Sequence, residues 1–121
     1  MSIVPTVVIS NTAQGAANGA YNGTDTTWYT DKYKGDGYYG YTDGLHTVSY
    51  KLTGFVGVIT VQASLAASPT DVDWFNLDNT VGDGTTPLTS TGFFNFSGNF
   101  VWIRISITNF TAGTINRVIY N

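Results

Sequence analysis

Apolar and polar side chains alternate with a period of two along much of this chain. The alternation is clearest at 59–67, where apolar residues occupy every second position and Thr, Gln, Ser and Ala lie between them. It recurs at 48–52 and at 100–108. Because successive side chains of a strand point to opposite faces, this period predicts strands with one buried face.

Shorter segments rich in β-branched and aromatic residues complete the pattern, separated by Gly, Pro, Asn and Asp. Further strands are expected at 4–10, 94–96 and 115–120, with an extended stretch at 75–77 and a hairpin over 28–41 that turns at 34–37. Turns are expected at 43–44, at 112–113 and at 98–99, where the chain would close a tight hairpin, and a break at 54–57. Loops are expected at 11–24 and 78–86, and a capped helical turn at 71–74.

About eight strands at roughly ten-residue spacing predict an all-β fold, namely a single-domain antiparallel β-sandwich that is jelly-roll-like. The absence of Glu and the presence of 14 Gly among 121 residues argue against long helices. A chain of this length, with 42% hydrophobic residues, supports one core. We expect one domain over 1–121, with an N-terminal strand and loop region at 1–34 and the main core at 35–121.

Charge and targeting signals exclude several classes of partner. The net charge is -3 with only five Lys and Arg residues, which disfavours nucleic acid, since such binders cluster cationic side chains. No apolar run approaches the roughly 20 residues needed to cross a bilayer, and the first residues lack a signal-peptide pattern. We therefore expect a soluble protein with no membrane partner, and zero Cys excludes disulfides.

No residue set in the sequence suggests catalysis, a metal or a cofactor. His46 is the single histidine, and there is no Cys or Glu to complete a metal site, so we expect it to begin a strand and bond to a turn. Asp71 and Asp73 are interpreted as turn or cap residues rather than a catalytic pair. The loop at 78–84 offers oxygen ligands but lacks a bidentate Glu, so a solvated turn is favoured over calcium binding.

A dense group of aromatic side chains raises the alternative of carbohydrate binding. Flat rings with polar rims stack on sugars, although core and hairpin packing would use the same residues. The candidate glycan-stacking residues are Trp28, Tyr29, Tyr38, Tyr39 and Tyr41.

A second feature is the stripe formed by Phe100, Trp102 and Arg104. These side chains alternate with aliphatic residues and so lie on the opposite face of the same predicted strand. Aromatic and Arg side chains dominate the energetics of protein interfaces, which makes the stripe a candidate interface. Burial between two layers is the alternative interpretation.

Four segments carry a resemblance to a known family. They read Tyr-Gly-Tyr-Thr-Asp-Gly-Leu-His-Thr-Val at 39–48, Ala-Ala-Ser-Pro-Thr-Asp-Val-Asp-Trp-Phe at 66–75, Gly-Asn-Phe-Val-Trp-Ile-Arg at 98–104 and Asn-Phe-Thr-Ala-Gly-Thr-Ile at 109–115. From residue 35 to its end, the chain resembles virion structural modules of the contractile-tailed phages that infect marine cyanobacteria. The resemblance implies a β-sandwich at a fixed position on the capsid, neck or tail, without catalytic residues.

These observations lead to two expectations of function. The first is a non-enzymatic capsid decoration or cement protein, assembled in the host cytoplasm into the virion, whose partners are capsid lattice proteins and possible copies of itself. The alternative is a glycan-binding module on a phage tail, neck or fibre. Hydrolysis of host polysaccharide is a minor third reading, disfavoured because Glu is absent.

Overall fold

The structure, a computed structural model, describes residues 6–35 and 44–121. Within these ranges, seven strands form one hydrogen-bonded sheet, and the pairings between them are antiparallel. In chain order the elements are β1 (Thr6–Ala13), β2 (Trp28–Tyr29), β3 (Tyr33–Lys34), β4 (Leu45–Ser64), the 3-10 turn η1 (Asp71–Asp73), β5 (Phe75–Val81), β6 (Leu88–Ser97) and β7 (Trp102–Tyr120). Within the described ranges, no helix has the length and hydropathy needed to span a bilayer.

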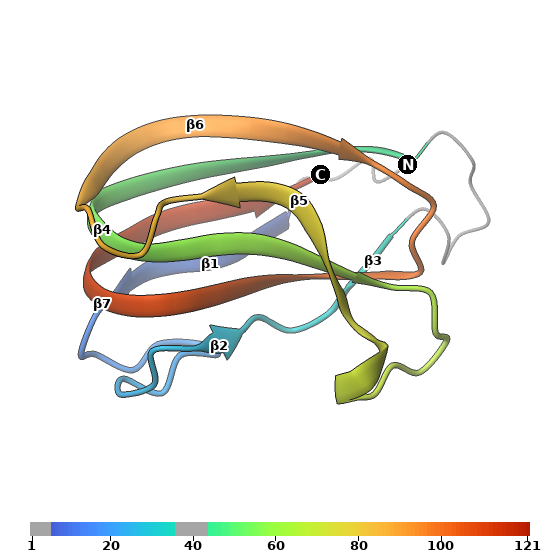
Figure 1. Ribbon diagram of the computed structural model, residues 1–121, viewed down its shortest axis with the longest axis horizontal. Coiled ribbons are helices and arrows are strands. Elements are labelled where there is room, and N and C mark those ends of the chain that lie inside the picture. The colour runs from blue at the N-terminus through green and yellow to red at the C-terminus, as the bar shows by residue number, and fades with distance from the viewer. Residues whose placement is uncertain (1–5, 36–43) are drawn as a thin grey trace.

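Two long strands turn this single sheet into a sandwich. β4 and β7 pair along almost their whole length, and Figure 1 shows both turning back on themselves at the same edge of the molecule. The first part of β4 and the last part of β7 form a first layer with the order β6-β4-β7-β1. The last part of β4 and the first part of β7 form a second layer, in which β5 pairs with β4 while β2 and β3 pair with β7.

Left-handed backbone positions allow the two strands to bend. Gly54 in β4 has a φ of 57°, and Asn109 and Gly113 in β7 have φ values of 52° and 87°. A Cβ atom on Gly113 would lie 2.2 Å from the carbonyl oxygen of Gly54, so the two bends pack backbone against backbone. This close approach requires glycine, which tolerates positive φ and occupies no side-chain volume.

The hydrophobic core lies between the layers and receives alternate side chains from both. Before the bend β4 buries Val48 and Leu52, whereas after it the buried side chains are Ile59 and Val61, so the inward phase changes from even to odd positions. His46 is also buried. Its Nδ1 lies 3.2 Å from the hydroxyl of Tyr120, and its ring packs against the rings of Phe96 and Tyr120, which also contact each other.

The structure confirms the all-β, antiparallel, jelly-roll-like sandwich, and η1 confirms the helical turn after Pro69. Several boundaries differ from the predictions. β1 extends to Ala13, β4 ends at Ser64, β7 begins at Trp102, and β5 continues into the segment expected as the loop 78–86.

The predicted turns were wrong where they assumed that neighbouring segments pair. The hairpin predicted over 28–41 lies only partly within the described residues: its first arm forms β2 and β3, which both pair with β7, whereas its turn at 34–37 lies largely, and its second arm at 38–41 wholly, outside the described residues. β6 pairs with β4, so 98–99 closes no tight hairpin with the next strand. The break at 54–57 and the turn at 112–113 are bends inside continuous strands, because β4 and β7 keep pairing on both sides of them.

Candidate functional site

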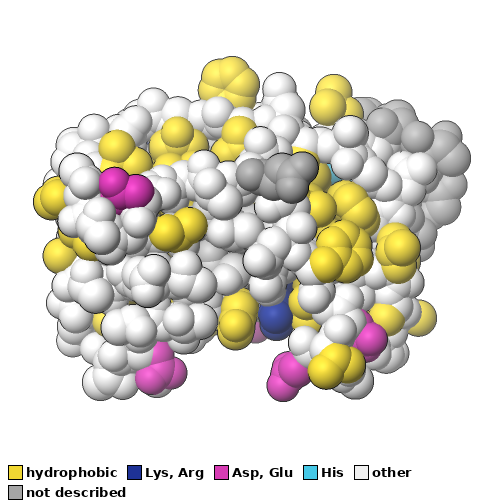
Figure 2. All heavy atoms as spheres, in the orientation of Figure 1, with side chains coloured by type: hydrophobic (Ala, Val, Ile, Leu, Met, Phe, Trp, Pro, Cys, Tyr) yellow, Lys and Arg dark blue, Asp and Glu magenta, His cyan; other side chains and the backbone are white. Residues whose placement is uncertain are grey.

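An open groove crosses the outer face of the second layer. It has a volume of about 480 Å³, within the range of roughly 300–1,000 Å³ typical of small-ligand sites. In Figure 2 it is the notch at the lower edge of the molecule, with basic atoms at its floor and apolar and acidic atoms on its rims. Its lining residues are Thr30, Asp31, Lys32, Pro69, Asp71, Trp74 and Arg104.

Arg104 of β7 forms the floor of the groove between two aromatic rings. Its guanidinium carbon lies 4.1 Å from the centre of the Tyr29 ring and 4.4 Å from that of the Trp74 ring. Its Nε–H donates a 2.7 Å hydrogen bond to Oε1 of Gln62 on the adjacent β4. The Gln62 amide in turn donates to Oδ1 of Asn76 on β5 at 2.8 Å. The guanidinium is therefore in contact with two aromatic rings and hydrogen-bonded at one edge.

Each wall of the groove is fixed by its own hydrogen bonds. On one side, the Thr30 hydroxyl accepts from the Ile105 backbone N–H at 3.0 Å, and the Thr30 N–H donates to the Ile105 carbonyl. On the other side, Asp73 accepts from both the N–H and the hydroxyl of Thr70 at the start of η1. A short turn capped in this way places the following residue, Trp74, over the sheet.

Trp102 of β7 lies next to the groove, in contact with its lining residue Lys32. Its indole N–H donates a 2.9 Å hydrogen bond to the carbonyl of Ala67, and the Lys32 ammonium lies 4.7 Å from the ring centre. The aromatic rings of this surface are thus paired with cations, an attraction worth about 0.5–2 kcal/mol per contact.

The charges that line the groove balance. Lys32 and Arg104 face Asp31 and Asp71, and no ion pair closes between any of these four among the described residues. Partial burial lowers the pKa of the Arg104 guanidinium, and the nearby Tyr29 and Asp71 groups oppose that decrease. The guanidinium remains protonated at neutral pH, because an arginine starts from a pKa above about 12.

The predicted glycan-stacking residues separate in the structure. Trp28 is only 6% exposed and packs against Tyr21 and Phe110 in the core, so its assignment as a stacking platform was wrong. The cause is register, since Trp28 lies opposite Ile107, an inward position of β7. Tyr29 points the other way, is 41% exposed and borders the groove. Tyr38, Tyr39 and Tyr41 lie outside the described residues.

The predicted stripe is also divided. Trp102 and Arg104 share the outer face of β7, as the period of two indicated; Arg104 lines the groove, and Trp102 lies beside it in contact with Lys32. Phe100 precedes β7, is partly buried against the core and meets Phe75 edge to face at 5.6 Å between ring centres. Whether the stripe is a protein interface stays a prediction.

Sequence reasoning did not place Lys32, Gln62, Asp71 or Trp74 in a site. The available signals were Gln62 as a long polar side chain at an outward position of β4, and Trp74 directly after a capped turn. Gln62 pairs with Arg104 across β4 and β7, and the Trp74 ring contacts the same guanidinium; both contacts join residues far apart in sequence, so the local pattern did not indicate them.

The acidic loop after β5 is organised by its own backbone. Oδ1 of Asp83 accepts the backbone N–H groups of Thr85 and Thr86 at 2.9 and 2.8 Å. These bonds lower the pKa of Asp83 to about 2. No cluster of three or more metal-ligating side chains occurs in the part of the chain that the structure describes. The observed contacts of Asp83 are those of a turn-forming residue.

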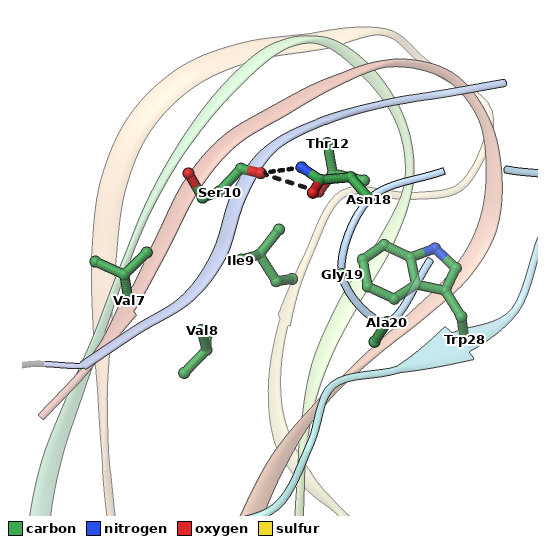
Figure 3. A pocket seen from close by; sticks show the side chains of 9 residues that line it. All are labelled: Val7, Val8, Ile9, Ser10, Thr12, Asn18, Gly19, Ala20 and Trp28. Carbon is green, nitrogen blue, oxygen red and sulfur yellow. Dashed lines mark hydrogen bonds between the residues drawn. The ribbon is translucent and has the colours of Figure 1, made fainter. Parts of the chain in front are cut away.

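A second, smaller hollow of about 210 Å³ opens between β1 and the segment before β2. Figure 3 shows the side chains of Val7 and Ile9 on one side and the Trp28 indole with Ala20 on the other. The Asn18 amide closes one end by donating to the Ser10 carbonyl at 2.6 Å. The hollow therefore lies where the two layers meet at their open edge.

The outer face of the first layer carries exposed apolar side chains. Phe93 is 67% exposed and lies in a row with Ser49, Ile119 and Val7, one residue from each of four adjacent strands. Leu45, also on this layer, is 62% exposed. Large apolar side chains gathered on one face are typical of protein contact surfaces.

The chain was compared with protein families, curated proteins and solved structures. No protein-family model matches it, and no curated protein matches it. It is similar in structure to a family 29 carbohydrate-binding module from Piromyces equi, with 13% sequence identity, coverage of 97% of this chain and 89% of that chain, and a TM-score of 0.44. A similarity at this level assigns neither a family nor a function to the chain.

Proposed function

We propose that this protein binds carbohydrate, without turnover, in the groove floored by Arg104. The proposal depends on one observation, a guanidinium held between Tyr29 and Trp74 at the bottom of an open, polar groove. Sugars present C–H faces that pack on aromatic rings and hydroxyl groups that bond to Arg, Asp and amide side chains. An open groove also admits an internal stretch of a polymer.

The test is a glycan array followed by calorimetry on the purified chain. We expect Trp74→Ala to weaken binding at least about tenfold, which corresponds to about 1.4 kcal/mol. Phe93→Ala is the matched control, because it removes an exposed aromatic ring from the opposite layer. An array without signal at high protein concentration, or full binding by the Trp74 variant, would count against the proposal.

A second proposal concerns where the protein works. We propose that it is a structural component of a phage virion, first of all a capsid decoration or cement protein. It would dock through the outer face of the first layer. The supporting observation is the exposed row that contains Phe93, together with Leu45. This assignment complements the groove, since a sandwich has two outer faces.

Particle assembly tests the second proposal. We expect stoichiometric copies on the shell and loss of incorporation when Phe93 or Leu45 is replaced by Asp, with the isolated variants still folded. Labelled protein found only at fibre tips, or normal incorporation of both variants, would exclude a shell role through this face.

A further inference from the structure

We propose that the groove selects neutral sugars, through neighbouring hydroxyl groups that bridge Arg104 and Asp71 without a metal ion. This inference rests on the proposed carbohydrate function and specifies its ligand. It is based on the hydrogen-bond donors and acceptors of the groove that have no partner among the described residues.

The first observation is the free edge of the guanidinium. The Nε–H of Arg104 donates to Gln62, and its guanidinium contacts the rings of Tyr29 and Trp74. Among the described residues, its terminal amino groups have no hydrogen-bond partner. A guanidinium has five N–H donors, so four remain in a fixed plane at the floor of the groove.

The second observation is an acceptor across the groove. Asp71 lies at the start of η1 and is exposed, and its charge acts on Arg104 without an ion pair within 4.0 Å. No hydrogen bond to its carboxylate is recorded in the described part of the chain. The donors of Arg104 and the acceptor Asp71 thus line the same groove without bonding to each other.

A sugar hydroxyl suits this arrangement because it both accepts and donates. One hydroxyl oxygen can accept from Arg104 while an adjacent hydroxyl donates to Asp71, and both hydrogen bonds are charge-assisted. A uronate or sulfate would gain Arg104 and Lys32 but would meet the carboxylates of Asp71 and Asp31. The balanced lining therefore favours an uncharged ligand.

The arrangement is also organised before binding. Gln62 fixes Arg104 at one edge, Asn76 fixes Gln62, and the two rings limit rotation of the guanidinium. Side chains that are already ordered lose little entropy when a ligand arrives. Sugars that differ only in the arrangement of their hydroxyl groups should then bind with different affinities.

The experiment measures binding by calorimetry with two ligand sets, neutral hexose oligosaccharides and oligomers of hexuronic acid, at 20 and 300 mM NaCl. We expect the neutral set to bind, with less than a twofold change in affinity between the two salt concentrations and none on addition of EDTA. Asp71→Asn, which cannot accept as a carboxylate, should weaken binding about tenfold, and Arg104→Lys by at least as much. Asp25→Asn, a change at an exposed site outside the groove, should have no effect.

The outcomes separate the inference from the function beneath it. If uronates bind more tightly, lose affinity with salt and gain it in Asp71→Asn, the site binds sugars but the neutral bridge is wrong. Unchanged binding in Asp71→Asn together with lost binding in Trp74→Ala has the same meaning. If neither ligand set binds, the proposed carbohydrate function itself is excluded along with the bridge.

Discussion

At the scale of single residues, the groove depends on how one cation is held. Arg104 would lose rotamer freedom if a ligand had to order it, but Tyr29, Trp74 and Gln62 already restrict it from three directions. Arg suits this position better than Lys, because its planar group can stack on two rings and still donate from its edge. The chemistry of the site therefore includes residues that need not touch the ligand.

Gln62→Leu tests this positioning role. The substitution keeps the approximate volume of the side chain but removes the acceptor for the Arg104 Nε–H and the donor to Asn76. We expect urea denaturation to show a loss of about 2–3 kcal/mol, because two hydrogen bonds are removed and one of them is donated by a charged group. Sugar affinity should fall about threefold to tenfold. Gln62→Glu keeps the acceptor and should restore most of that affinity; equal losses in both variants would contradict a positioning role.

Asp83 gives a pH prediction at the same scale. Backbone N–H groups of Thr86 and Thr85 stabilise its ionised form and lower its pKa to about 2. A group whose pKa is lowered on folding adds stability above its unfolded pKa of about 3.9, and that contribution is lost as the pH falls toward 2. Carboxyl NMR should show a midpoint near 2, and Asp83→Asn should remove this titration. A midpoint at the ordinary value of 3.8 would contradict the turn.

At the scale of elements, the bends in β4 and β7 decide the architecture. Each strand serves both layers, so one pair of bends converts a flat sheet into two packed faces. Positive φ at Gly54 and Gly113 and the contact between their backbones make the two bends interdependent. The groove depends on the bends indirectly, because they place the part of β7 that contains Arg104 in the second layer.

Two alanine substitutions test this dependence. Gly54→Ala meets no atom within 4 Å, so it should cost only the left-handed strain, about 1–2 kcal/mol. Gly113→Ala adds a Cβ at 2.2 Å from a backbone oxygen and should cost more than about 3 kcal/mol or prevent folding. Thermal unfolding followed by circular dichroism measures both. Equal effects of the two changes would show that the contact between the bends is unimportant.

The alternation of side chains predicted the strands, the sandwich and the outward side of Trp102 and Arg104, because a period of two is a local property. It could not distinguish a bend from a turn at 54–57, since a change of inward phase accompanies either. Nor could it choose the partner of β2. Pairing with β7, with Trp28 opposite Ile107, buried Trp28 and brought Tyr29 to the groove. Both depend on contacts far apart in sequence.

At the scale of the whole molecule, the sandwich separates two kinds of surface. The second layer shows a groove of rings, cations and carboxylates, whereas the first layer shows Phe93 and its apolar neighbours. Because the core lies between the layers, a ligand in the groove and a partner on the other face need not compete. A module that attaches by one face and binds by the other requires this separation.

Thermal stability with and without sugar tests the separation in one measurement. A ligand at a hundred times its Kd stabilises the folded state by about 2.7 kcal/mol. In a chain of this size that raises the Tm by roughly 10 °C. Phe93→Ser should change the Tm of the free protein little, because the ring is exposed, and should keep the full increase. Trp74→Ala should reduce the increase to about half or less at the same ligand concentration, because it removes one ring that holds Arg104 and weakens binding at least about tenfold. The reverse result, an increase kept in Trp74→Ala but lost in Phe93→Ser, would place the sugar on the first layer and exchange the roles of the two faces.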